Sequence, residues 1–129
     1  MIGIGLDVVD LDRFRKTLER TPTFGRRVFT AGEVEYAEKR RDPTERYAVR
    51  FAAKEAVLKA MGVGLWSCPL NEIEVVRAES GQPSIVLHGE AAALATSKGI
   101  ESWLLTMTHT DLVAEAIAVA LGPPASAPA

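Results

Sequence analysis

The segment 44–61 carries the residues best suited to chemistry. Within its ten residues 50–59 it holds one carboxylate, Glu55, among three basic residues: Arg50, Lys54 and Lys59. At about 100° of rotation per helical residue, Glu55 falls inside an arc of apolar side chains that includes Phe51 and Leu58. A carboxylate in such surroundings is costly unless a cation lies beside it. We therefore expect Glu55 to contact a basic side chain or a metal ion.

Lys59 is one candidate for that cation. Glu55 and Lys59 have the i, i+4 spacing at which a glutamate and a later lysine pair along one helix, and this interpretation needs no ligand. The second interpretation is a site for a metal ion and a phosphate ester. Mg²⁺ takes one or two carboxylates together with water and phosphate oxygens, and Asp7 could supply the second carboxylate. Asp7 could equally be a turn or helix-entry aspartate.

Another candidate lies at His109, which stands between Thr108 and Thr110 in a polar turn. At a strand end these three side chains could present hydrogen-bond donors to a phosphate. The alternative is a solvated loop histidine, which is the interpretation we give to His88. Cys68, the single cysteine, is interpreted as structural because it has no second thiol for a disulfide or a zinc site.

Apolar spacing and turn residues predict the elements that position these groups. We expect strands over 2–8, 73–76, 85–87, 100–108 and 112–121, and helices over 11–20, 31–41, 44–61 and 90–98. In the first strand, Ile4, Leu6 and Val8 alternate with glycines and Asp7, which predicts that the apolar side faces the core and that Asp7 points away from it. Segment 44–61 has no Gly or Pro and is apolar on nearly every side, so it is expected to be a central buried helix.

These elements predict an α+β fold in which the central helix packs on a mainly antiparallel sheet. The chain has 129 residues, 47% of them hydrophobic, which suits one domain over 1–122 followed by a disordered tail over 123–129. No apolar run approaches the roughly 20 residues of a membrane span, and Asp7 disfavours a secretory signal. We expect a cytoplasmic protein without a membrane partner.

Charge is distributed unevenly along the chain. Residues 1–64 hold 13 Lys and Arg against 10 Asp and Glu, whereas residues 65–129 hold 2 against 7. A basic surface on the first half suits an anionic ligand or an acidic partner, although solvated helix faces have similar compositions. The net charge of -2 argues against a dedicated nucleic-acid binder.

Four motifs carry a resemblance to a known family: Gly-Ile-Gly-Leu-Asp at 3–7 with Arg13 beyond it, Arg-Phe-Ala-Ala-Lys-Glu-Ala at 50–56 with Lys59, Gly-Gln-Pro at 81–83 and Thr-Met-Thr-His-Thr at 106–110. Together they resemble the bacterial holo-[acyl-carrier-protein] synthases, the small phosphopantetheinyl transferases. The resemblance spans nearly the whole chain.

The resemblance implies Mg²⁺-dependent transfer of 4′-phosphopantetheine from coenzyme A to a serine of apo acyl carrier protein in fatty acid biosynthesis, with release of adenosine 3′,5′-bisphosphate. It implies Asp7 and Glu55 as metal ligands and catalytic residues, with Lys59 neutralising the transferred phosphate. The base is left open between Glu55 and a metal-bound water. The residues expected to bind coenzyme A are Arg50, Lys54, Lys59, Gly62, Gly81, Gln82, Pro83, His109 and Thr110.

For the acidic carrier protein, the expected contacts are first Arg13 and then Arg20, Arg26 and Arg27. The family also implies homotrimers whose active sites lie at subunit boundaries, where Asp7 and Glu55 of one subunit would meet His109 of another.

Thr106, Gln82 and Ser84 depart from the family pattern, which puts the nucleotide side of the pocket in doubt. The alternative function is a module that binds coenzyme A or another nucleotide without chemistry.

Overall fold

The computed structural model describes residues 1–124, so residues 125–129 of the predicted tail lie outside the described residues. The elements in chain order are β1 (Gly3–Asp10), α1 (Leu11–Arg20), α2 (Pro22–Val28), α3 (Ala31–Ala37), α4 (Thr44–Met61), the 3-10 turn η1 (Leu70–Glu72), β2 (Ile73–Arg77), β3 (Pro83–Leu87), α5 (Gly89–Ser97), β4 (Ser102–His109) and β5 (Val113–Leu121). The predicted α+β class is confirmed.

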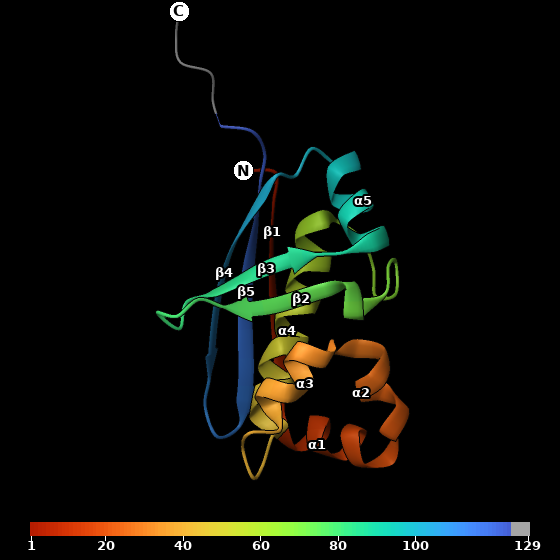
Figure 1. Cartoon of the computed structure of the whole chain (residues 1–129), viewed down its shortest axis with the longest axis vertical. Coiled ribbons are helices and arrows are strands. Elements are labelled where there is room, and N and C mark those ends of the chain that lie inside the picture. Colours follow the sequence, from red (N-terminus) through yellow and green to blue (C-terminus); the bar gives the residue numbers. More distant parts are fainter. Residues whose placement is uncertain (125–129) are drawn as a thin grey trace, which may run out of the picture.

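The central helix α4 organises the two antiparallel sheets. One sheet has the strand order β1-β5-β4, and the other is the β2-β3 hairpin. Helix α4 packs against β1 and β5 and also contacts β2. In Figure 1 the hairpin crosses in front of α4, while α1, α2 and α3 gather at its lower end. Most α4 side chains are buried, as its sequence predicts.

The contact between β1 and α4 is unusually close because glycine faces the helix. A Cβ atom on Gly3 or Gly5 would lie 1.9 Å from the carbonyl oxygen of Ala60 or Ala56, respectively. The prediction that the apolar side of β1 faces the core is therefore wrong. Ile4, Leu6 and Val8 are 60%, 52% and 52% exposed, because only the glycine side can approach the helix backbone this closely.

The expected caps of the early helices are present. Asp10 accepts a hydrogen bond from the Arg13 backbone N–H, and Thr30 and Glu33 form the predicted capping box. Helix α3 ends at Ala37, earlier than expected. Helix α2 was not predicted: Pro22 occupies its first turn, where the missing N–H costs no hydrogen bond, so this proline starts a helix as well as following one.

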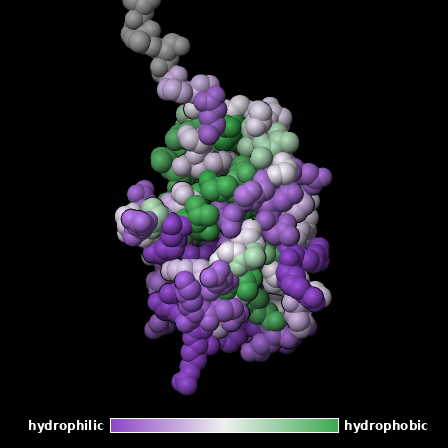
Figure 2. Space-filling view, in the orientation of Figure 1, coloured by the Kyte–Doolittle hydropathy of each residue, from purple (hydrophilic) through white to green (hydrophobic). Residues whose placement is uncertain are grey.

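Among residues 1–124, no helix combines the length and the apolar character needed to cross a membrane. In the space-filling view of Figure 2, hydrophilic side chains gather over the lower half of the molecule, where α1, α2 and α3 lie. This surface belongs to the basic first half of the chain.

Candidate active site

Asp7 and Lys59 form an ion pair between β1 and α4. Lys59 Nζ donates to Asp7 Oδ1 over 3.0 Å and to the Leu6 carbonyl oxygen over 2.9 Å. The Asp7 side chain is 15% exposed because its strand position faces the helix. Among the described residues, the ion pair of Lys59 is with Asp7 and not with Glu55, so the intrahelical pair considered from the spacing is not formed.

Glu55 lies in the same cleft as Asp7. The cleft has a volume of about 330 Å³, and its lining also includes Phe51, Phe14 and Arg13. Burial raises the pKa of Glu55, and the charge of Asp7 raises it further, against a lowering effect of Lys59. Lys59 thus neutralises Asp7, whereas Glu55 has no salt-bridge partner among the described residues and is the carboxylate whose charge is least balanced.

This donor set fits a hard divalent cation. Carboxylate oxygens are the protein ligands that Mg²⁺ prefers, and a cation would relieve the repulsion that acts on Glu55. Within residues 1–124, no group of three or more His, Cys, Asp or Glu side chains is arranged to hold a metal. Asp7 and Glu55 alone would leave most coordination positions to water and substrate oxygens, as is usual for Mg²⁺ at phosphate esters.

Lys54 does not lie in this cleft. Its side chain is fully buried, and its Nζ lies 2.7 Å from Glu33 Oε1 and donates to the carbonyl oxygens of Leu70 and Ile73. Burial lowers the pKa of Lys54, and Glu33 opposes that effect. The expectation that Lys54 contacts coenzyme A is corrected here, because an ammonium with three interior partners has no donor left for a ligand at the surface.

A second cluster surrounds His109, at the end of β4. His109 Nε2 lies 3.1 Å from Glu45 Oε1, and a cavity of about 240 Å³ brings His109 together with Arg50. Thr110 lies in the β4–β5 turn, where its hydroxyl oxygen accepts hydrogen bonds from the backbone N–H groups of Leu112 and Val113. The structure thus places Arg50 and His109 in one pocket, with Thr110 next along the chain.

The Gly-Gln-Pro turn at 81–83 lies beside this second cluster. Gly81 has a φ of 89°, a left-handed conformation that favours glycine, and Arg77 Nη2 lies 3.1 Å from the position of an added Cβ. Pro83 pairs with Arg77 in the β2-β3 ladder. Gly62, by contrast, ends α4 with a φ of 74° and lies in neither cluster.

The two clusters lie at opposite edges of the three-stranded sheet. Asp7 is on β1 and His109 is on β4, and β5 separates these strands. Their lining residues do not overlap. One subunit therefore does not bring Asp7 and Glu55 together with His109.

Of the four arginines expected to bind a carrier protein, the structure brings Arg13 to the cleft of Asp7 and Glu55. Arg20 is exposed in the last turn of α1. Arg26 lines a different cleft, beside Arg27, whose guanidinium carbon lies 4.6 Å from the Trp66 ring centroid. Of these four arginines, Arg13 alone lines the cleft of the two carboxylates.

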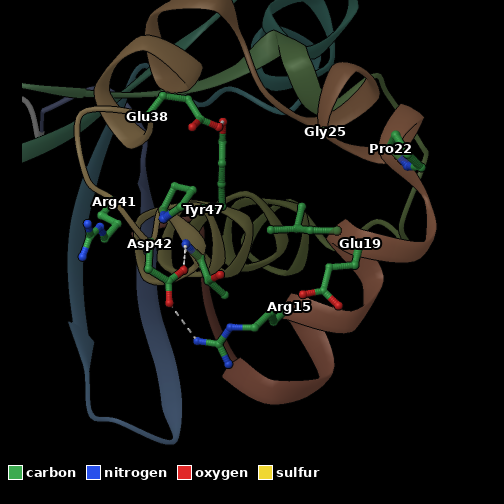
Figure 3. Close-up of a pocket in the computed structure, with 11 residues that line it drawn as sticks. Arg15, Glu19, Pro22, Gly25, Glu38, Arg41, Asp42 and Tyr47 are labelled. Atoms are coloured by element: carbon green, nitrogen blue, oxygen red, sulfur yellow. Dashed lines mark hydrogen bonds and ion pairs between the residues drawn. The ribbon is translucent and has the colours of Figure 1, made fainter.

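The sequence did not predict a larger cleft, of about 570 Å³. It lies between α1, α2 and the start of α4, and Figure 3 shows Tyr47 pointing toward Glu38 and Arg15 reaching Asp42. Tyr47 donates to Glu38 Oε1 over 2.7 Å, and an Arg15 guanidinium nitrogen lies 3.1 Å from Asp42 Oδ2. These groups satisfy one another, and neither carboxylate of the first cleft lines this space.

Comparisons with known proteins show the family of the chain. The family model of the 4′-phosphopantetheinyl transferase superfamily matches residues 3–116. A holo-[acyl-carrier-protein] synthase of Frankia casuarinae is 47% identical, over 93% of this chain and 97% of the relative. The chain therefore belongs to the 4′-phosphopantetheinyl transferase superfamily, which confirms the family and the enzyme class expected from the sequence.

Solved structures show the same fold. A holo-ACP-synthase from Plasmodium yoelii has a TM-score of 0.86 at 31% identity and covers 96% of this chain and 97% of its own. The Helicobacter pylori holo-[acyl-carrier-protein] synthase in complex with coenzyme A has a TM-score of 0.80 at 26% identity, with coverage of 92% and 99%.

Proposed function

We propose that this chain transfers the 4′-phosphopantetheine group of coenzyme A to a serine of an apo acyl carrier protein in fatty acid biosynthesis. The serine hydroxyl gives its proton to the base, which is left open between Glu55 and a water, and its oxygen forms a bond to the phosphorus that carries the pantetheine arm. The bond from that phosphorus to the bridging oxygen breaks, which releases adenosine 3′,5′-bisphosphate. The observation that carries the proposal is the placement of Asp7 and Glu55 in one cleft of a phosphopantetheinyl transferase, with Lys59 bound to Asp7. The names of the relatives and the coenzyme A complex of the Helicobacter protein support it.

Mg²⁺ is part of this proposal, with Asp7 and Glu55 as its protein ligands. When bound, the ion supplies positive charge to pyrophosphate oxygens during phosphoryl transfer. Lys59 is held against β1 by Asp7 and the Leu6 carbonyl, which fixes its ammonium at the cleft. From there it neutralises charge on the phosphate that is transferred.

The nucleotide end of coenzyme A is assigned to the second cluster. Arg50 and His109 line its cavity, and the turn that contains Gly81, Gln82 and Pro83 lies next to it through Arg77. Thr110, next to His109 in the chain, is proposed to bind the same end of coenzyme A. A contact between Gly62 and coenzyme A stays a prediction. In the structure, Gly62 ends α4 in a left-handed conformation.

A homotrimer with active sites at subunit boundaries is also proposed. The outer face of the three-stranded sheet exposes Ile4, Leu6, Val8, Leu104 and Ile117. Apolar surface of this kind on adjacent strands is typical of a protein interface. Because Asp7 and His109 lie at opposite sheet edges of one chain, a neighbouring copy can supply the His109 cluster to the carboxylates of the first.

The acidic carrier protein is expected on the side of α1 and α2, where the hydrophilic surface of Figure 2 lies. Arg13, which lines the cleft of Asp7 and Glu55, is proposed to bind it first, and Arg20 and Arg26 are proposed to extend the contact. We propose a cytoplasmic location for the reaction. Cys68 is a free buried thiol, which is compatible with a reducing compartment.

The decisive experiment is the intact mass of an apo acyl carrier protein after incubation with this protein, coenzyme A and Mg²⁺. The expected result is a gain of one phosphopantetheinyl group, lost when a chelator is present or when this protein is omitted. Binding of coenzyme A without any gain of mass on several carrier proteins would support the non-catalytic binding module instead.

A further inference from the structure

The segment between α4 and η1 contains a tight turn at residues 64–67. The Ser67 backbone N–H donates to the Gly64 carbonyl oxygen over 3.2 Å, and the Ser67 hydroxyl donates to the same oxygen over 2.6 Å. Leu65 and Trp66 therefore occupy the two central positions of the turn. They are 47% and 43% exposed, so the turn presents two large apolar side chains at the surface.

Trp66 holds a backbone conformation that tryptophan rarely adopts. Its φ is 69°, and within residues 1–124 it is the single non-glycine residue with a positive φ. At the third position of a turn, such a φ normally selects glycine or asparagine, because a Cβ atom is disfavoured there. Burial of the ring does not offset this cost, since the residue stays nearly half exposed. Strained residues of this kind cluster at binding sites, which makes the ring a candidate contact for a partner.

The Trp66 ring lies against a basic helix. The Arg27 guanidinium carbon, in the last turn of α2, is 4.6 Å from the ring centroid. Neither Arg27 nor its exposed neighbour Arg26 forms an ion pair within residues 1–124. Both line a cleft of about 500 Å³ with Trp66, and the one carboxylate of that lining is Glu90. Contact with the ring uses the face of the guanidinium, so its N–H groups can still bind carboxylate oxygens of a partner.

This apolar and basic surface continues the side of the molecule that is assigned to the carrier protein. Helix α2 contacts both α1 and η1, so it connects the exposed Arg20 at the end of α1 with the turn at 64–67. An acidic, amphipathic segment matches such a surface, with carboxylates toward the arginines and apolar side chains toward the ring. Tryptophan and arginine are also the residues that most often dominate the binding energy of protein interfaces.

We propose that the turn at 64–67 is an apolar anchor for the acidic carrier protein, in which Trp66 packs against apolar side chains of the carrier and Arg27 binds one of its carboxylates. This inference rests on the proposed function and adds a second type of contact to it, since the family resemblance assigned the carrier to arginines. Leu65 and Trp66 supply the apolar area that charge pairs lack. The contact with the ring also holds the Arg27 side chain in place before the carrier binds.

Trp66→Gly separates a structural role from a binding role. Glycine accepts the positive φ, so the thermal midpoint should equal or exceed that of the unmodified protein, whereas loss of a structural tryptophan would lower it. Surface plasmon resonance should show carrier binding weakened about tenfold or more, the loss typical of an interface tryptophan. The affinity for coenzyme A should change by less than about twofold. Trp103→Phe is the matched control because Trp103 packs against the core from β4, and it should bind the carrier normally.

Arg27→Gln removes the charge and keeps the ring. It should weaken carrier binding about threefold or more and make the association rate less sensitive to salt. Because Arg27 acts in contact with the ring, the double variant with Trp66→Gly should lose less affinity than the product of the two single losses. Lys98→Gln removes a charge at the exposed end of α5 and should have no effect.

Tryptophan emission reports on the turn directly. The chain has two tryptophans, so Trp103→Phe leaves Trp66 as the single emitter. A saturating apo carrier protein without tryptophan should shift its emission to shorter wavelength, because the ring loses contact with water. Coenzyme A alone should leave the emission unchanged, and an equal shift with coenzyme A alone would overturn the proposal. This measurement decides the case even if Trp66→Gly is destabilised.

The two proposals fail in different ways. If the unmodified protein modifies the carrier but Trp66→Gly binds it with normal affinity, the anchor is overturned while the transferase proposal stands. A changed oligomeric state of Trp66→Gly in size-exclusion chromatography would assign the turn to a contact between copies of this chain and would also overturn the anchor. If the unmodified protein neither binds nor modifies any carrier protein, both proposals are wrong.

Discussion

The ammonium of Lys59 lies 3.0 Å from Asp7 Oδ1, across the contact between α4 and β1, rather than on Glu55 one turn earlier in its own helix. Asp7 is thereby neutralised in part, and Glu55 is left in a half-buried position where its pKa is raised by burial and by Asp7. Because Lys59 binds Asp7 and not Glu55, the two residues of α4 have different roles. Lys59 orders the cleft from one side, and Glu55 is the group with most to gain from a divalent ion.

The first prediction concerns that ion. Glu55→Gln and Asp7→Asn should each lower the transfer rate at least about 100-fold, because a neutral side chain cannot hold the ion that offsets phosphate charge. Circular dichroism should show an intact fold. Addition of Mg²⁺ to the coenzyme A complex should raise the thermal midpoint of the unmodified protein further, but not that of either variant.

The exposed Glu35 on α3 offers a matched control, and Glu35→Gln should transfer at the normal rate. Normal transfer by Glu55→Gln would contradict the metal assignment.

The cleft could be predicted only in part from the sequence. The helical arc around Glu55 correctly indicates a carboxylate among apolar side chains, which the structure leaves half-buried. It cannot show that Lys59 turns to Asp7, because that pair joins residues 52 positions apart. The same limit hid the contact between Arg27 and Trp66, which joins α2 to the turn at 64–67.

The orientation of β1 shows a second limit. Alternation of apolar residues with glycine predicts a strand with two different faces, but it does not say which face is covered by the helix. Hydrophobicity alone favours the side of Leu6, whereas the close approach of α4 requires the side of Gly5. Lys54 was expected at the coenzyme A site from its place in the motif at 50–56, and that local motif cannot show that its ammonium is buried against Glu33 of α3.

The second prediction concerns the carrier protein. Arg13→Glu should weaken binding of the carrier about tenfold or more and leave the affinity for coenzyme A unchanged, because the exposed Arg13 lies beside the carboxylate cleft and not in the second cluster. Surface plasmon resonance at two salt concentrations measures the first affinity. Lys98→Glu, at the exposed end of α5, makes the same change of charge far from α1 and should have no effect. Equal loss of both affinities would instead place Arg13 in the nucleotide pocket.

The third prediction concerns assembly. Leu6→Glu puts a charge on the exposed apolar face of β1 and should convert the protein to monomers in size-exclusion chromatography. Since the proposed site needs two subunits, transfer should be lost with the trimer. Val34→Glu makes the same change at an exposed position of α3 and should leave assembly intact. Full transfer by a monomeric Leu6→Glu protein would show that one chain contains the complete site.

The fourth prediction tests whether Lys54 stabilises the fold rather than binding coenzyme A. Lys54→Met leaves the Glu33 carboxylate buried without its cation and should lower the free energy of unfolding by about 3–5 kcal/mol. Adding Glu33→Gln to that variant should recover part of the loss, which urea denaturation of both variants can measure. Coenzyme A affinity, measured well below the unfolding midpoint, should not change. If Lys54→Met loses affinity for coenzyme A while its stability is unchanged, Lys54 binds coenzyme A after all.

The fifth prediction tests whether the glycine side of β1 sets the position of Asp7. Gly5→Ala would place a methyl group 1.9 Å from the Ala56 carbonyl oxygen, so β1 must move away from α4. Urea denaturation should show a loss of about 1–3 kcal/mol or more, the usual cost of overpacking. Gly25→Ala is the matched control, because no atom lies within 4 Å of its new methyl group and alanine favours the helix α2 by about 0.5–1 kcal/mol.

Because Asp7 follows Gly5 on the same strand face, the shift should also separate Asp7 from Lys59 and Glu55. Transfer by Gly5→Ala should therefore fall even under conditions where the protein stays folded, while Gly25→Ala keeps its rate. If Gly5→Ala is destabilised but transfers normally while folded, the close contact of β1 with α4 supports the fold without setting the geometry of the cleft.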